Sequence, residues 1–190
     1  MKIFKSKIFK TLVAIFIIGV FLGVISYYIF GIKDNSIINY FESIKNEKFN
    51  YGIGLLNSIK YNNKYLFFIW IFGLIFIFSI FIPFIVCFRG ISVGFTISLI
   101  ICTYKVKGLI LALIMLFPCI LLNEIIYLLE SYYSISFANR TYKVFKNNKN
   151  ITLKYYIKNY FLRYLILSIV LLISSLFEIY ITSNILKYVL

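Results

Sequence analysis

The chain has 190 residues, of which 62% are apolar and 14% are charged, and its formal net charge is +14. A soluble domain of this size could not hide so much apolar surface, because small folds leave a large fraction of their surface wet. The positive charge does not indicate nucleic-acid binding, because the basic residues cluster between long apolar runs, where they hold loops in the cytoplasm and contact anionic lipid. We therefore expect an all-α, polytopic bundle of about five transmembrane helices in a cell membrane.

The first apolar run, residues 11–30, follows a basic N-terminal segment. A membrane-crossing helix needs roughly 20 residues, so this run is long enough. It is too long for the core of a signal peptide, and no small-residue cleavage site precedes the next loop, so we expect an uncleaved span. Gly19 and Gly23 form a small-xxx-small face on this span that suits close packing with another helix.

Residues 31–64 form a polar segment that we expect outside the cytoplasm. Part of it has apolar residues at helical spacing, which predicts a short amphipathic helix on the membrane surface: Ile37, Ile38, Phe41 and Ile44. This ridge could dock a partner protein or only contact lipid, and the sequence leaves both interpretations open. Glu42 and Glu47 do not share a helix face, so we expect no paired-carboxylate hydrolase centre there.

Four further apolar stretches are predicted to cross the membrane: residues 65–88, 90–104, 108–129 and 164–185. The stretch 90–104 is short, but if it were re-entrant, the basic segment 140–163 would face outward. We therefore expect it to cross, which leaves 12 of the 20 basic residues in the cytoplasm, in residues 1–10, at Arg89 and in residues 140–163. Within this last segment, apolar residues on one face predict an interfacial helix from Leu153 to Phe161.

Charged side chains inside apolar stretches are costly in lipid, so each marks a candidate site: Arg89, Glu124 and Glu178. Arg89 and Glu124 are both expected toward the cytoplasmic side. They form either part of an ion or proton path or a structural ion pair between helices, and we favour the ion pair. The motif from Gly90 to Gly94 is a GxxxG, which predicts tight packing where the second and third spans meet.

No catalytic, metal-binding or cofactor-binding pattern is recognisable. The chain has no histidine, and its three cysteines, Cys87, Cys102 and Cys119, lie inside apolar runs without zinc-type spacing. It also lacks the GxxxxGK[ST] loop that binds nucleotide phosphates. We therefore expect no enzymatic activity, no metal and no cofactor.

The region from about Tyr65 to Arg140 resembles the stage II sporulation protein M family. The resemblance is carried by Trp70-Ile-Phe-Gly73, Phe88-Arg89-Gly90-Ile-Ser-Val-Gly94-Phe95-Thr96, Gly108-Leu-Ile-Leu-Ala112, Leu116-Phe-Pro118 and Ser134-Ile-Ser-Phe137. It implies a septal or mother-cell membrane anchor for two peptidoglycan-degrading partners, which resemble stage II sporulation proteins D and P. Together these proteins thin the septal wall and drive engulfment of the forespore.

The alternative interpretation is a membrane subunit of a transporter or permease. The charged residues in or beside the spans and Pro118, within the stretch 108–129, favour it. The chain has no clear internal repeat and no pair of broken spans at matching positions, which are typical of many transporters.

The predicted topology can be tested with reporter fusions. Fusions after residues 10 and 150 should report a cytoplasmic location, and one near residue 48 an extracytoplasmic location, because the basic residues concentrate around the first two positions. An extracytoplasmic signal at residue 150 would contradict the arrangement with five spans.

Overall fold

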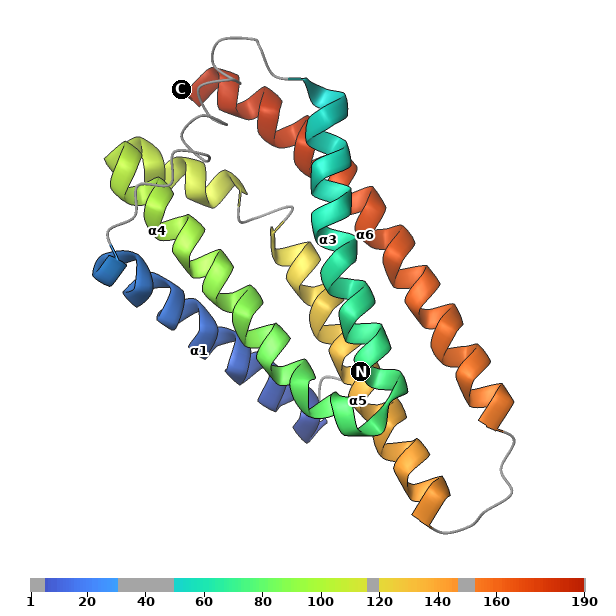
Figure 1. Cartoon of the computed structure of the whole chain (residues 1–190). Coiled ribbons are helices and arrows are strands. Elements are labelled where there is room, and N and C mark those ends of the chain that lie inside the picture. The colour runs from blue at the N-terminus through green and yellow to red at the C-terminus, as the bar shows by residue number, and fades with distance from the viewer. Residues whose placement is uncertain (1–5, 31–49, 116–119, 147–152, 190) are drawn as a thin grey trace.

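The chain forms an antiparallel bundle of five long helices in the computed structural model, which describes residues 6–30, 50–115, 120–146 and 153–189. Of these residues, 98% are helical and none lies in a strand, so the predicted all-α class is confirmed. The helices are α1 (Lys7–Phe30), α3 (Tyr51–Leu74), the 3-10 helix η1 (Phe76–Phe81), α4 (Ile82–Met115), α5 (Leu121–Lys146) and α6 (Leu153–Val189). Successive long helices run in opposite directions, so α1 begins and α6 ends at opposite ends of the bundle (Figure 1).

The distribution of side chains is that of a membrane protein. Among the described residues, three helical segments are long and apolar enough to cross a membrane: Lys7–Phe30, Phe76–Ile110 and Tyr155–Tyr180. Their surfaces expose large apolar side chains such as Phe21, Phe84 and Ile166, whereas Arg89 and Glu124 are buried. Lipid favours this inverted arrangement, because it solvates apolar side chains and excludes charges.

The predicted span 65–88 is wrong as a single helix. α3 ends at Leu74, η1 connects it to α4, and α4 begins at Ile82. Pro83 lies in the first turn of α4, where its missing N–H removes no helical hydrogen bond. The sequence stays apolar throughout this connection, so hydropathy could not locate the break. As a result Arg89, which was expected to close a span at the membrane edge, lies inside α4.

The predicted span 108–129 is also divided between two helices. α4 continues through the predicted span 90–104 and ends at Met115, and α5 begins at Leu121. Pro118 and Cys119 lie outside the described residues. The apolar run 108–129 therefore contains the end of α4 and the start of α5, and the single predicted helix is wrong.

α4 bends sharply at Lys105, whose φ of 51° lies in the left-handed region that side chains other than glycine rarely adopt. After the bend, Gly108 packs so closely on the preceding arm that a Cβ there would meet the carbonyl oxygen of Ile100. The arm 106–115 therefore folds back on the arm 82–104. The basic residues Lys105 and Lys107 mark the bend, which lies between the predicted spans 90–104 and 108–129.

The predicted loops 31–64 and 140–163 are partly helical. Residues 51–64 form the first half of α3, where the Asn50 side chain caps the helix by accepting hydrogen bonds from two backbone N–H groups. The basic segment is divided between α5 and α6, and the predicted interfacial helix is the first part of α6. The predicted ridge lies outside the described residues: Ile37, Ile38, Phe41 and Ile44.

α1 packs against α4 through two glycines from each helix: Gly19 and Gly23, Gly90 and Gly94. A Cβ at Gly19 would lie 2.5 Å from the carbonyl oxygen of Cys87, and one at Gly90 would lie 3.0 Å from the Cα of Gly19. The two backbones are therefore in direct contact, as small residues permit. The partner differs from the one expected, because Gly90 and Gly94 pack on α1 and not on the helix that precedes them.

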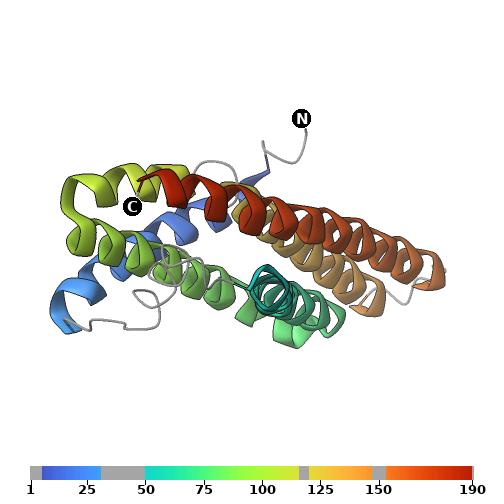
Figure 2. The same cartoon turned by 90° about the horizontal axis from the view of Figure 1, so that it is seen from above.

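The other three helices, α3, α5 and α6, pack on one another, and Figure 2 shows α5 and α6 lying along each other. Their shared core contains side chains that are at most 1% exposed: Leu66, Ile69, Tyr127 and Leu171. A second core of Phe9, Leu12, Val86 and Leu128 joins the pair of α1 and α4 to α5. The polar groups of the bundle lie among these apolar contacts.

The glycine contact predicts the effect of Gly94→Leu. A Cβ at this position would meet the Val20 carbonyl oxygen, so the two helices must separate and folded protein in membranes should fall severalfold. Gly52→Ala is the matched control, because its Cβ would touch only the Asn50 side chain at 3.4 Å. Immunoblots of membranes and size-exclusion profiles in detergent provide the measurement. Unchanged levels and profiles for Gly94→Leu would contradict the close contact.

Candidate functional site

A buried ion pair joins α4 to α5. Arg89 Nη2 donates to Glu124 Oε1 at 2.7 Å, and the two side chains are only 8% and 4% exposed. Arg89 lies in the third turn of α4, and Glu124 lies in the first turn of α5, where a negative charge is favoured by the helix dipole. Both charges are shielded from solvent, so the attraction between them offsets part of the free-energy cost of burying each one.

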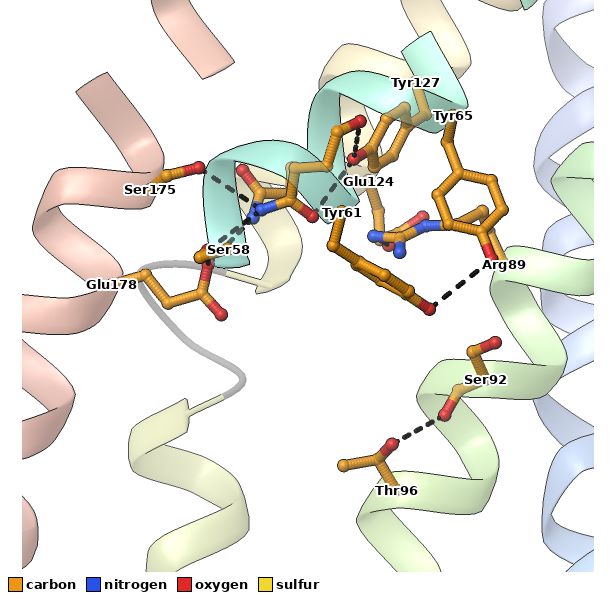
Figure 3. A network of polar contacts seen from close by, with 12 residues as sticks. Ser58, Tyr61, Tyr65, Arg89, Ser92, Thr96, Glu124, Tyr127, Ser175 and Glu178 are labelled. Atoms are coloured by element: carbon orange, nitrogen blue, oxygen red, sulfur yellow. Dashed lines mark hydrogen bonds and ion pairs between the residues drawn. The ribbon is translucent and has the colours of Figure 1, made fainter. Parts of the chain in front are cut away.

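Three tyrosine rings surround the Arg89 guanidinium. Its Cζ lies 4.4 Å from the ring centroid of Tyr127, 5.1 Å from that of Tyr65 and 5.6 Å from that of Tyr61. A cation over an aromatic face is attracted by about 0.5–2 kcal/mol, more when water is excluded. The rings therefore extend the ion pair to α3, which supplies Tyr61 and Tyr65 (Figure 3).

Asn62 connects this charged cluster to α6. The Tyr127 hydroxyl lies 3.0 Å from the backbone oxygen of Asn62 and 3.2 Å from its Oδ1. The Asn62 amide nitrogen donates to Ser58 Oγ at 3.3 Å and to Ser175 Oγ at 3.2 Å. One buried amide therefore holds groups from α3, α5 and α6 together.

Glu178 completes the network from the α6 side. Its Oε2 accepts from Ser58 Oγ and from the Asn123 amide nitrogen, each at 3.4 Å. Figure 3 shows Ser58 and Glu178 pointing toward each other from neighbouring helices. All three predicted intramembrane charges, Arg89, Glu124 and Glu178, thus belong to one network that spans α3, α4, α5 and α6.

The uncharged members of the network were not predicted from the sequence. On α3, Ser58, Tyr61, Asn62 and Tyr65 recur at helical spacing and share one face, but the first three lie in the predicted polar segment 31–64 and only Tyr65 lies in a predicted span. Asn123 and Tyr127 lie on α5, at the start of a helix whose boundary was misplaced. The contacts that Glu178 makes with Ser58 and Asn123 could not be predicted, because these residues are distant in the sequence.

A second buried polar cluster lies nearer the other end of α5. Glu130, a residue that the sequence did not mark as a candidate, is 0% exposed. Neither of its carboxylate oxygens has a hydrogen-bond partner among the described residues. One turn further along, Ser134 shares a hydrogen bond of 2.7 Å with the Tyr160 hydroxyl, which also donates to the Trp70 backbone oxygen at 2.8 Å. This cluster therefore ties α5 and α6 to the end of α3.

The chemistry open to these groups is limited by their burial. Within the described ranges, no group of three or more histidine, cysteine or acidic side chains could hold a metal ion. Cys87 and Cys102 are free thiols, and they lie on α4. The network is thus an arrangement of paired charges, hydroxyls and amides that holds helices together.

Comparison with known proteins identifies the family. The model for stage II sporulation protein M matches residues 11–183. The chain belongs to the stage II sporulation protein M family. Neither the search of the curated proteins nor the search of the solved structures found a match. The matched range begins in α1 and ends in α6, so it includes every residue of the polar network. Membership of the family supports a role related to sporulation.

A double-mutant cycle tests the ion pair in this family member. Arg89→Gln and Glu124→Gln each leave one unpaired charge, which costs about 2.5–3.5 kcal/mol on insertion scales. The double variant removes both charges, so it should lose less stability than the sum of the two single variants. Unfolding of the purified protein in detergent gives the measurement. Simple additivity would mean that the two side chains are not coupled in solution.

Proposed function

We propose that this protein is a multi-pass membrane scaffold that holds extracytoplasmic wall-degrading partners during septal thinning and engulfment of the forespore. Family membership supports the link to sporulation, and the apolar helices support the membrane location. The partners would resemble stage II sporulation proteins D and P, and membrane lipid would surround the bundle. The protein itself would have no enzymatic turnover.

The observation that carries the proposal is the internal pairing of the polar groups. Arg89 binds Glu124, Tyr127 binds Asn62, and Ser58 binds Glu178, so these side chains join helices to one another. A hydrolase needs an acid or nucleophile that meets substrate and water. A scaffold instead needs a bundle whose helices keep fixed relative positions, which a buried and mutually bonded network provides.

The proposal requires that all five long helices cross the membrane. α3 and α5 are not among the three helical segments that are long and apolar enough by themselves to cross a membrane, but their buried polar side chains, such as Asn62 and Glu124, face the interior of the bundle. The end where α5 leads to α6 carries exposed basic side chains, including Arg140, Lys143 and Lys158. The positive-inside rule favours the cytoplasm for that end, and therefore the opposite side for the start of α3 (Figure 1).

An apolar groove offers a lateral docking surface at the proposed extracytoplasmic end. It has a volume of about 470 Å³ and lies between the first turns of α3 and the later part of α6. Leu55, Leu176 and Phe177 are among its lining residues. An apolar membrane anchor of a wall-degrading partner would fit such a surface, because close packing drives helix association in lipid.

A transporter subunit is the second candidate. The bend at Lys105 and the separate start of α5 form an interrupted crossing next to buried charges, a combination that transporters use near their substrate sites. This function predicts flux of a solute across the membrane that depends on Arg89 and Glu124. The scaffold function predicts none.

The scaffold proposal is tested by affinity capture from sporulating cells. The unaltered protein should retain wall hydrolases, and Leu176→Trp, which fills the groove, should reduce their recovery severalfold with no loss of membrane level. Ile166→Trp, on the same helix but outside the groove, is the matched control and should leave recovery unchanged. Peptidoglycan cleavage by the purified protein alone would show that it is an enzyme, and capture without any wall hydrolase would contradict the scaffold function.

A further inference from the structure

Two lysines lie on the outer face of α3. Lys60 and Lys64 are both exposed, and they are about one helical turn apart. The buried residues of α3 share one face of the helix: Asn62, Leu66, Ile69 and Gly73. At about 100° per residue, the two lysines lie on the opposite face. Figure 2 shows α3 at one edge of the bundle, so this face points away from the other helices.

These lysines lie deep in the part of the bundle that crosses the membrane. Gly19, near the middle of α1, is in backbone contact with Gly90 of α4. The guanidinium of Arg89, the neighbour of Gly90, lies 5.1 Å from the ring centroid of Tyr65, which directly follows Lys64. The other lysine is about 6 Å further toward the start of α3. Both lysines are therefore near the depth of the middle of α1 and far from the lipid headgroups.

No acid among the described residues pairs with either lysine. α3 contains no aspartate or glutamate. Glu124 is paired with Arg89, Glu130 is 0% exposed, and the Glu178 carboxylate accepts hydrogen bonds from α3 and α5. An ammonium group that faces lipid without a partner is unfavourable, and extension of the side chain to the headgroups relieves this cost only near helix ends. A partner molecule is therefore needed to cover the two charges.

The rest of the outer face of α3 is apolar. Large apolar side chains are exposed before and after the lysines: Ile53, Leu56, Phe67 and Phe68. The face thus has apolar ends and a cationic centre. An apolar membrane helix with one carboxylate near its middle is complementary to it, because the two helices can pack along their length while the carboxylate neutralises the lysines.

Two other occupants fit this face less well. A second copy of the chain would have to offer an acid on its surface, and the acids that the structure describes are paired or bonded inside the bundle. An anionic lipid carries its charge at the headgroup, which is too shallow for lysines at this depth.

We propose that the outer face of α3 binds a membrane helix of a wall-degrading partner, with a carboxylate of that helix held between Lys60 and Lys64. This inference rests on the scaffold function for the identity of the partner. The surface is separate from the apolar groove, because Leu55 of the groove lies on the buried side of α3. The two surfaces can therefore hold different helices.

Fluorescence energy transfer between the purified protein and a designed peptide in phosphatidylcholine vesicles tests the site directly. The peptide is an apolar helix of about 20 residues with a single central glutamate, and two control peptides carry glutamine or lysine at that position. The glutamate peptide should bind about tenfold more tightly than either control, because its carboxylate pairs with the lysines. Lys60→Gln combined with Lys64→Gln should abolish this preference. Lys107→Gln combined with Lys158→Gln removes two exposed charges elsewhere on the bundle and, as the matched control, should keep it.

Affinity capture from sporulating cells links the site to the partner. The Lys60→Gln, Lys64→Gln variant should recover severalfold less wall hydrolase than the unaltered protein. Its membrane level and Tm should stay the same or rise, because it removes two charges that face lipid. A lower Tm and membrane level in this variant, with glutamate and glutamine peptides that bind the unaltered protein alike, would show a structural role for the lysines and overturn the proposal.

The remaining outcomes separate this surface from the scaffold function. Equal binding of the glutamate and glutamine peptides to the unaltered protein overturns the proposal, and hydrolase capture that the Lys60→Gln, Lys64→Gln variant retains leaves the scaffold function standing. A dimer of the unaltered protein that dissociates in this variant would show that a second copy covers the face, which also overturns the proposal. A preference for the glutamate peptide without recovery of any hydrolase supports the carboxylate site and contradicts the scaffold function.

Discussion

The pairing of Arg89 with Glu124 is the constraint on which the bundle depends. An isolated charge among apolar helices is unfavourable, so the guanidinium and the carboxylate must lie together, and this requirement fixes α4 against the start of α5. The tyrosines that cover Arg89 come from α3 and α5, so the same pair also positions α3. Through Tyr127 and Asn62 the constraint reaches Ser175 on α6.

A different interaction holds α1. It packs on α4 by backbone contact at glycines and contributes no charge to the network. The bundle thus combines two means of helix association in lipid, which are close approach of small residues and hydrogen bonding between buried polar side chains. Both leave the outer surface to large apolar side chains, which suits a protein surrounded by lipid.

The bonds between helices are consistent with a protein whose helices keep fixed relative positions. The buried polar groups form bonds between helices, and the apolar groove between α3 and α6 lies on the side of the bundle. Membership of the stage II sporulation protein M family relates the chain to sporulation. The proposed scaffold would hold its partners at the membrane by the fixed positions of its helices, which the hydrogen bonds of the polar interior maintain.

The sequence by itself determined the helical class, the membrane environment, the family and the three charges of the polar network, Arg89, Glu124 and Glu178, but not the buried acid Glu130. These follow from local properties, which are apolar runs of sufficient length, rare charges within them and short motifs such as Gly90 to Gly94. The tertiary structure decided where helices break and what each polar group meets. A uniformly apolar run contains no local signal for the turn after Leu74, and the partners of Glu178 lie 120 and 55 residues away in the chain. Periodicity reports only which residues share a face, whereas contacts between faces depend on how the helices pack.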